Sequence, residues 1–476
     1  MKKFIILLVT FYFSAALPAQ VIDELNAPKT YSKEQLKADI EFLLQTIEHV
    51  HPNPFHAISR EKMYKLKDSV LKSFSDGMSA RQAWPGFARI VAALNEGHSN
   101  LNPPADDTQG LQNGKTIIFP VLIKEFDGDG LIVRYDLSDD SVMATGDRII
   151  SINGRSSKDL MNYFTSFYGG LTNWRNLQVI RDFAGNLLLH GINAPYRIEY
   201  IHNGEKKEIT IKGTTFPQLR ERAAAVRKQS GAAEVKANYS FERMENNTGY
   251  MNFRSMNDYE KFSKFLDSVF TDIKRNPVNG LIIDLRQNGG GSSQLGEKLL
   301  AYITDKAFLM SAGSVWKVSD EYKAFIKEQA LTNKVYASGS FQNYLNFETG
   351  KMISFNSNKA YKPGNNGLRY SGKVCVLIGP NTFSSANMLA NAIKDFKLAA
   401  LIGEATGEPG NDYGELYWNK LPNTQLGFST CTKQFIRANG DKNDPNPILP
   451  DIEVKQDRHS TKDNVLEFAK EWVLKK

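Results

Sequence analysis

The chain has 476 residues, which is long enough for two or three domains. Hydrophobic residues make up 41% and charged residues 23%, ordinary values for a globular protein that exclude wholesale disorder. The formal net charge of +7 is spread along the chain without a block of like charges, which favours a solvated surface over a nucleic-acid-binding one.

The first twenty residues have the pattern of a targeting segment. Lys2 and Lys3 precede an apolar run over residues 4–13, and residues 14–20 read SAALPAQ. This pattern is typical of a signal peptide cleaved near Ala19 or Gln20. The run is shorter than the roughly 20 residues that a membrane span needs. We therefore expect a signal peptide over residues 1–20, a periplasmic or secreted protein, and no stable membrane anchor.

Residues 21–110 are predicted to form a helical region. Apolar side chains recur at helical spacing in three stretches between residues 31 and 97, and the last ends at Gly97 and His98. A histidine group at positions 49, 51 and 56 raises the question of a metal site. Two prolines interrupt this group, so no single helical face carries it, and a structural helix end is the favoured interpretation. Without an HExxH segment, and with only two cysteines, the sequence predicts no metal site.

Residues 111–215 are predicted to be β-rich, with short strands separated by glycine and aspartate turns. Residues 146–154 read GDRIISING and resemble the "GDxIxxING" signature of PDZ domains. That resemblance implies a PDZ-like domain that binds a peptide end by strand addition. Residues 160–192 form a longer insert than a compact PDZ domain carries. Residues 216–245 are predicted to be a linker, partly helical.

Residues 246–476 have an α/β pattern. Buried strands are expected at 250–253, 280–285, 373–378 and 399–403, and helices at 259–273, 294–303 and 384–396. Cys375 and Cys431 are the two cysteines of the chain, and the sequence leaves open whether they form one bridge or two buried thiols.

Two strand-to-helix turns in this region carry chemistry. The glycine turn, Gly289–Gly291, follows a buried strand, where backbone N–H groups approach a ligand oxygen closely. No GxxxxGK[ST] segment marks it as a phosphate loop, and an oxyanion hole uses the same geometry. Ser384 stands at the start of a helix, whose free N–H groups favour a developing anion. An N-cap serine has the same pattern.

Four segments in the same order resemble those of the tricorn and C-terminal-processing serine peptidases. They are DLRQNGGG at 284–291, TFSSAN at 382–387, GEATG at 403–407 and PDIEV at 450–454, beside the family's "DLRxNxGG", "TxSAAE", "GExTxG" and "PDxxV". The resemblance implies an α/β catalytic domain of the ClpP/crotonase-like spiral type and a serine endopeptidase that acts on polypeptides. Ser384 would be its nucleophile, and no cofactor is implied.

The general base differs between the branches of this family. The processing proteases use a lysine shortly after "GExTxG", but residues 408–412 read EPGND. The tricorn-like branch uses a histidine from before the PDZ-like domain, and residues 94–99, LNEGHS, resemble its "DGHT" segment. His98 is therefore the predicted base, since imidazole titrates near neutral pH. By the same resemblance Asp444 would orient His98, although glutamate is usual there, and Asn387 also replaces a usual glutamate.

The implied mechanism is proton transfer from Ser384 to His98, with Asp444 holding the imidazole and backbone N–H groups near Gly290 and at Ser385 binding the oxyanion. Two other classes stay open. A catalytically inactive peptide- or lipid-binding relative is suggested by the departures at Asn387 and Asp444. A nucleotide-binding enzyme would instead use the glycine turn.

Overall fold

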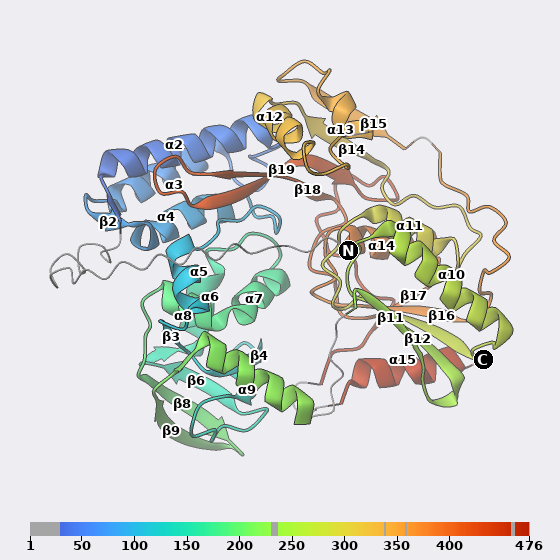
Figure 1. The fold of residues 1–476 in the computed structure, drawn as a ribbon, viewed down its shortest axis with the longest axis horizontal. Helices are drawn as coiled ribbons and strands as arrows, with labels where there is room; N and C mark the ends of the chain where they lie inside the picture. The colour runs from blue at the N-terminus through green and yellow to red at the C-terminus, as the bar shows by residue number, and fades with distance from the viewer. Residues whose placement is uncertain (1–28, 230–236, 338, 358, 458–461, 476) are drawn as a thin grey trace, which may run out of the picture.

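The computed structural model describes residues 29–229, 237–337, 339–357, 359–457 and 462–475. The predicted signal peptide lies outside these ranges. The molecule has three parts, which lie around its centre (Figure 1): helices near the N-terminus, a β-rich region and an α/β domain. Within the described ranges, no helix combines the length and apolar character needed to cross a membrane.

The N-terminal region contains the three expected helices, α2 (Lys33–Val50), α3 (Arg60–Ser73) and α4 (Ala80–Ala92). Ser32 and Ser79 begin α2 and α4 with capping boxes, in which the serine and a glutamine three residues later bond each other's backbone N–H. The apolar faces of these helices share a core with Leu426 and Phe428, far along the chain. This packing joins the N-terminal helices to the C-terminal half of the protein.

The β-rich region forms an antiparallel sheet in the order β4-β5-β6-β8-β9, with β7 beside β6. Its strands are β4 (Val121–Phe126), β5 (Leu131–Asp136), β6 (Arg148–Ile152), β7 (Arg155–Ser156), β8 (Tyr196–His202) and β9 (Glu205–Ile211). The insert noted in the sequence consists of helices: α6 (Ser157–Thr165), α7 (Thr172–Arg181) and α8 (Phe183–Leu189). These helices pack on the sheet through apolar side chains, so the insert belongs to this region's core.

Short elements connect this region to its neighbours. They are α5 (Ala105–Gln112), β3 (Ile117–Ile118), β10 (Thr214–Thr215) and α9 (Phe216–Gln229). Two other short strands, β1 (Thr30–Tyr31) and β2 (Met78–Ser79), pair with each other beside the N-terminal helices. The first half of the predicted linker is thus the helix α9.

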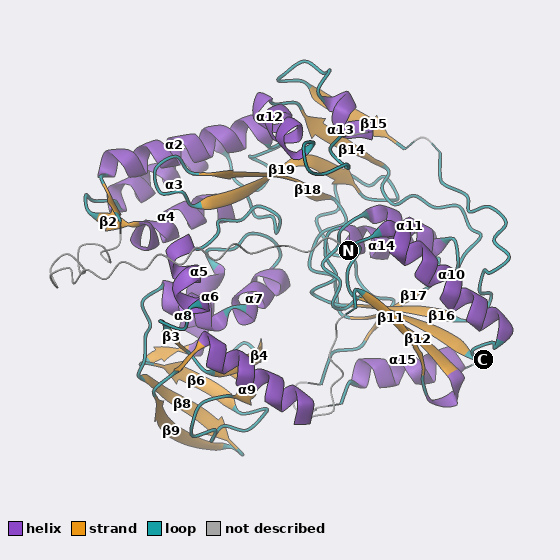
Figure 2. Cartoon of the chain, in the orientation of Figure 1, coloured by secondary structure: helices purple, strands orange, loops and turns teal. Residues whose placement is uncertain are grey.

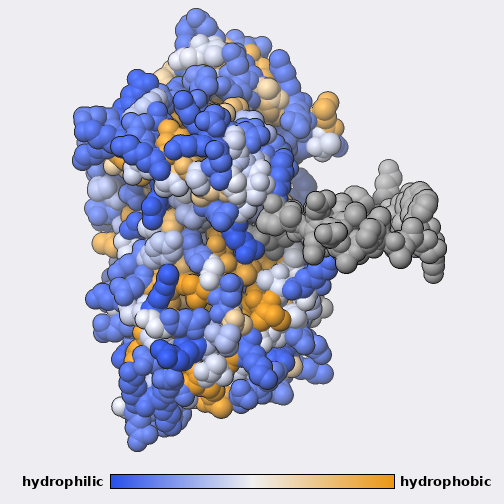
Figure 3. All heavy atoms as spheres, turned by 90° about the vertical axis from the view of Figure 1, so that its left-hand side faces the viewer, coloured by the Kyte–Doolittle hydropathy of each residue, from blue (hydrophilic) through white to orange (hydrophobic). Residues whose placement is uncertain are grey.

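On the face shown in Figure 3, most side chains are hydrophilic, and the apolar ones gather in patches mainly in the lower half.

The α/β domain is built on a six-stranded sheet in the order β11-β12-β13-β16-β17-β20, parallel except for β11. The strands are β11 (Tyr239–Arg243), β12 (Thr248–Phe253), β13 (Gly280–Asp284), β16 (Val374–Ile378), β17 (Ala400–Gly403) and β20 (Ile452–Glu453). Helices α10 (Tyr259–Arg275), α11 (Ser293–Leu300) and α14 (Ser385–Phe396) cover one face, and α15 (Asn464–Leu474) covers the other (Figure 2). Both turns singled out in the sequence therefore lie at the carboxyl edge of this sheet.

A second sheet, not predicted from the sequence, is antiparallel with the order β15-β14-β19-β18. Its strands are β14 (Gly313–Lys317), β15 (Met352–Asn356), β18 (Asp412–Lys420) and β19 (Gly427–Ile436), accompanied by α12 (Asp320–Gln329) and α13 (Gly339–Tyr344). One end of β19 reaches the N-terminal helices through a bridge between Leu101 and Phe428. Cys375 on β16 and Cys431 on β19 are both buried and unbridged, which settles the question left open by the sequence.

Candidate active site

Ser384 lies in the turn between β16 and α14, at the position before the helix. Its backbone has φ 54° and ψ −129°, a region that residues other than glycine rarely adopt. Such a conformation costs about 1–3 kcal/mol and persists where the surroundings enforce it. The Ser384 side chain makes no capping hydrogen bond to α14. The N-cap interpretation therefore fails for this hydroxyl, which is left for other chemistry.

The glycine turn packs directly against Ser384. A Cβ atom added to Gly290, whose φ is +97°, would lie 2.6 Å from the Ser384 Cβ, so only glycine fits. The Ser385 hydroxyl donates to the Gly291 carbonyl oxygen at 2.6 Å, which fixes the turn to the start of α14. The Gly290 N–H donates to Asn288 Oδ1 at 2.9 Å. The structure thus brings Gly290 and Ser385 to Ser384, but the Gly290 N–H already donates to Asn288.

His98 reaches this site from the other half of the chain. The Ser429 hydroxyl on β19 donates to the His98 carbonyl oxygen at 2.9 Å and accepts from the Asn100 N–H at 3.1 Å. The His98 ring lies 4.6 Å, centroid to centroid, from the ring of Phe383, the residue before the nucleophile. Strand β19 therefore carries the histidine loop to the serine turn.

Glu408 contacts both members of this pair. Its Oε1 lies 2.9 Å from His98 Nδ1, and its Oε2 accepts the Ser384 N–H at 2.6 Å. The first contact has the distance of a hydrogen bond without its alignment, so it acts chiefly through charge. Burial is the largest single effect and lowers the pKa of His98, but the charge and close contact of Glu408 together with the charge of Glu96 outweigh it, so the net pKa is raised. Sequence reasoning missed Glu408, although it directly follows the GEATG segment.

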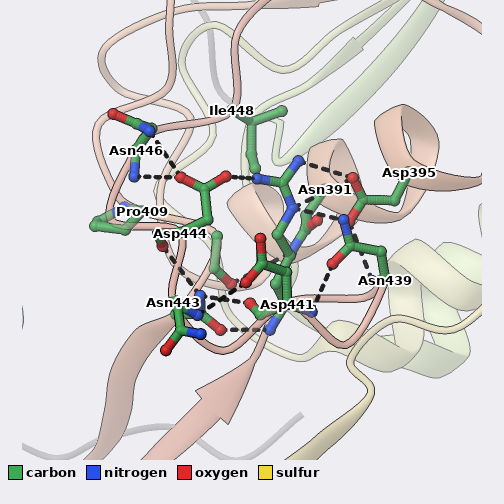
Figure 4. A network of polar contacts seen from close by, with 12 residues as sticks. Asn391, Asp395, Pro409, Asn439, Asp441, Asn443, Asp444, Asn446 and Ile448 are labelled. Atoms are coloured by element: carbon green, nitrogen blue, oxygen red, sulfur yellow. Dashed lines mark hydrogen bonds and ion pairs between the residues drawn. The ribbon is translucent and has the colours of Figure 1, made fainter.

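Asp444, the carboxylate expected at His98, belongs to a different network. One of its oxygens pairs with the Arg437 guanidinium, and the other accepts two N–H groups of Asn446 (Figure 4). The hydrogen bonds from Asn446, together with Arg437, keep the pKa of Asp444 below its usual range. Asp444 and Glu408 line one cavity of ≈ 250 Å³, yet the carboxylate in contact with His98 is that of Glu408. The structure therefore places Glu408 at His98, where the sequence had predicted Asp444.

Two further side chains hold Glu408. Asn387 on α14 donates from Nδ2 to the Pro409 carbonyl oxygen at 2.7 Å, a bond that the usual glutamate could not donate. Asp412 is buried, and its pKa is raised well above the usual range, by burial and by the charge and hydrogen bond of Glu408. The raised pKa favours the protonated form of Asp412 beside Glu408. The departure at Asn387 is accommodated by the loop that carries Glu408.

The histidines considered for metal binding are held by hydrogen bonds. His51 Nδ1 accepts the Asn53 N–H at 3.0 Å, and its Nε2 lies 2.9 Å from Glu96 Oε2. Cys431 also comes within 4.8 Å of this pair. Burial and the charge of Glu96 raise the pKa of the Cys431 thiol well above its usual range. These contacts support the structural interpretation of the group.

The insert of the β-rich region completes the wall of the site. Trp174 on α7 stacks on Phe383 with a centroid distance of 3.8 Å and an interplanar angle of 9°. Asn173 donates to the Thr406 carbonyl oxygen at 3.0 Å. Gly97 permits this packing, since an added Cβ would lie 2.7 Å from both aromatic side chains. The β-rich region thus contacts the residues that flank Ser384 and His98.

A serine before a helix, a histidine and a buried carboxylate at the edge of an α/β sheet are the residue types that serine-type peptidases use. Residues 247–454 match the profile of peptidase family S41. These residues therefore correspond to the peptidase domain of family S41. A curated relative, the chloroplastic C-terminal processing peptidase of Tetradesmus obliquus, is 22% identical over 363 residues. That alignment covers 73% of this chain and 63% of the relative, so the chain spans less than two thirds of the relative's length.

Solved structures share the fold over nearly the whole chain. Mature CPAF complexed with lactacystin superimposes with a TM-score of 0.64 at 15% identity, covering 93% of this chain and 98% of that one. Mature CPAF gives a TM-score of 0.62 at 14% identity, covering 93% and 97%. These similarities extend the shared fold beyond the matched family domain to the N-terminal and β-rich regions.

Proposed function

We propose that this protein is an exported serine endopeptidase that hydrolyses polypeptides through Ser384, His98 and Glu408. The observation that carries the proposal is the position of Glu408, whose two carboxylate oxygens contact His98 Nδ1 and the Ser384 N–H. Ion pairing to Glu408 favours the protonated imidazole that forms when the serine loses its proton. Ser384 is also held in a strained conformation with its hydroxyl free of capping.

The proposed reaction has two halves. Neutral His98 accepts the Ser384 hydroxyl proton as Oγ attacks the peptide carbonyl, and the protonated imidazole then protonates the leaving amine. Water, deprotonated by His98, hydrolyses the resulting acyl-enzyme ester and releases the second product. Ser385 begins α14, so its N–H has no acceptor within the helix and is the main proposed oxyanion donor. Gly290 would contribute its N–H only after release from Asn288.

Covalent labelling tests this function. A fluorophosphonate probe should label the wild-type protein at Ser384, and the Ser384→Ala variant should stay unlabelled at equal thermal stability. Cleavage of a casein-type polypeptide should be lost in the same variant. Absence of labelling in folded wild-type protein would favour the inactive binding relative of the same fold.

The β-rich region is proposed to be a PDZ-like module that admits substrate by binding a peptide end. Its support is the GDRIISING segment, which forms β6 and the turn after it. Deleting this region is a poor test, because Trp174 would be lost from the active site. A peptide with a free C-terminal carboxylate should instead slow cleavage of long polypeptides more than its amidated form does, without slowing Ser384 labelling. Equal inhibition of labelling would contradict the proposal.

Export is proposed from the first twenty residues alone. Protein isolated from the cell envelope or medium of its source should begin near Gln20 or Val21 on N-terminal sequencing. Recovery of Met1 from that fraction would refute it.

A further inference from the structure

A pocket of ≈ 430 Å³ lies beside the start of the nucleophile helix. It is lined on one side by α11 and by Met388 of α14, two helices that lie side by side (Figure 1). The Met388 N–H donates to the Ser384 carbonyl oxygen at 2.9 Å. At the other helix, Ser293 of the pocket lies two residues after Gly291, which accepts the Ser385 hydroxyl. Met388 and Ser293 therefore place one end of the pocket about one turn of α14 from Ser384, which is not itself a lining residue.

Aromatic side chains form the opposite wall. Phe355 and Tyr361 are 44% and 43% exposed, large fractions for apolar rings, and Phe308 packs edge to face against Tyr361 at 5.4 Å. Such walls suit the aliphatic stem of a long side chain, and aromatic faces also attract cations. The wall is therefore suited to a side chain with an apolar stem and a positive end.

Glu297 on α11 is the single carboxylate among the residues that line this pocket. It is partly buried, and burial raises its pKa with no opposing contribution from a cation. Lys359, the single cation of the lining, is itself exposed. Among the described residues, no side chain forms a hydrogen bond or ion pair with the Glu297 carboxylate. A partly desolvated charge without a partner is unfavourable, and a bound cation would offset that cost.

We propose that this pocket receives a lysine or arginine side chain of the substrate next to the cleaved bond, with Glu297 as the residue that selects it. This inference rests on the proposed peptidase function. The aromatic wall would contact the methylene groups, and the carboxylate would pair with the ammonium or guanidinium group. The protein would thus prefer basic residues beside the scissile bond over apolar residues of similar length.

Matched internally quenched peptides test the specificity. Peptides that differ only in arginine, lysine or norleucine at one position should be cleaved next to that position, at least tenfold faster in kcat/KM for the basic residues. Glu297→Gln should lower the arginine-to-norleucine ratio by about 10- to 100-fold, the range expected for loss of a charged partner. Glu260→Gln, the same substitution at an exposed position on α10, should leave the ratio unchanged. An unchanged ratio in folded Glu297→Gln protein would overturn the proposal.

A binding measurement separates this inference from the proposed function. In the Ser384→Ala background, a fluorescent arginine peptide should bind at least tenfold more tightly to protein with Glu297 than to protein with Glu297→Gln. If the wild type is labelled by fluorophosphonate but shows no basic preference, the pocket assignment is wrong and the peptidase assignment stands. If labelling fails while the arginine peptide still binds through Glu297, the peptidase assignment is wrong and the pocket assignment stands.

Discussion

Substitution of Glu408 by glutamine is the most informative perturbation of the site. The change keeps the size of the side chain and removes its charge. In the wild type, Glu408 lies 2.9 Å from His98 Nδ1. Two unit charges about 4 Å apart at an effective dielectric constant of about 20 interact by about 4 kcal/mol. Because about 1.4 kcal/mol corresponds to a tenfold change in rate, we expect kcat/KM to fall by about 10³-fold.

The assay is kcat/KM for an internally quenched peptide, together with the rate of fluorophosphonate labelling of Ser384. Both depend on deprotonation of the same hydroxyl, so both should fall. Asp444→Asn serves as the matched control, since Asp444 pairs with Arg437 instead of His98. We expect it to lower thermal stability while changing kcat/KM by less than tenfold. If Asp444→Asn abolished activity and Glu408→Gln retained it, the assignment of Glu408 would be refuted.

The pH dependence provides a second measurement on the same variant. Since the folded-state pKa of His98 is raised, activity should increase with pH through a midpoint above the ordinary value of 6.5. The stability that the His98–Glu408 ion pair contributes depends on pH in the opposite sense to activity. This contribution is fully present below the unfolded-state pKa of His98 and is lost as pH rises through the folded-state pKa. In the Glu408→Gln variant, the charge that raises the pKa of His98 is removed while burial still lowers it. The acid limb of the pH–activity profile should therefore move to lower pH.

Three further outcomes are expected. His98→Ala should lower kcat/KM by about 10³-fold or more. Lys394→Ala should stay near wild type, because Lys394 pairs with Asp451 on the protein surface. Equal losses of peptide cleavage in the two variants would contradict this. Gly290→Ala should prevent labelling by forcing the serine turn apart, and a wild-type labelling rate would argue against the packing described above. Asp412→Asn should lose less activity than Asp412→Ala, because an amide can replace a neutral acid as hydrogen-bond donor. The measurement is kcat/KM, and a larger loss in the asparagine variant would show that Asp412 is ionised.

The parallel strands could be predicted well from the sequence, because their apolar runs end at glycine and serine turns. β13 and β16 lie within one residue of the expected bounds, and their carboxyl edge carries the site. The antiparallel sheet was missed because β18 and β19 mix polar and apolar side chains. Both faces of these strands contact protein, so the alternation typical of a half-exposed strand is absent.

Glu408 was missed for a related reason. A glutamate followed by proline and glycine has the pattern of a connecting loop, and the family resemblance directed attention to Asp444. Its position shortly after β17 was a usable signal, because β17 is adjacent to β16 and both strands end at the edge where Ser384 lies. By contrast, the contact of His98 with this edge depends on β19, a strand that the sequence did not predict.

The stacked pair of Trp174 and Phe383 joins the β-rich region directly to the segment that carries Ser384. Phe383 precedes Ser384, the proposed nucleophile, and also contacts the ring of His98, the proposed base. The region cannot swing outward as a rigid body without separating this stack and exposing one side of the imidazole to water. Under the proposed mechanism, any exchange of substrate or product that requires the two domains to part would first require α7 to separate from Phe383.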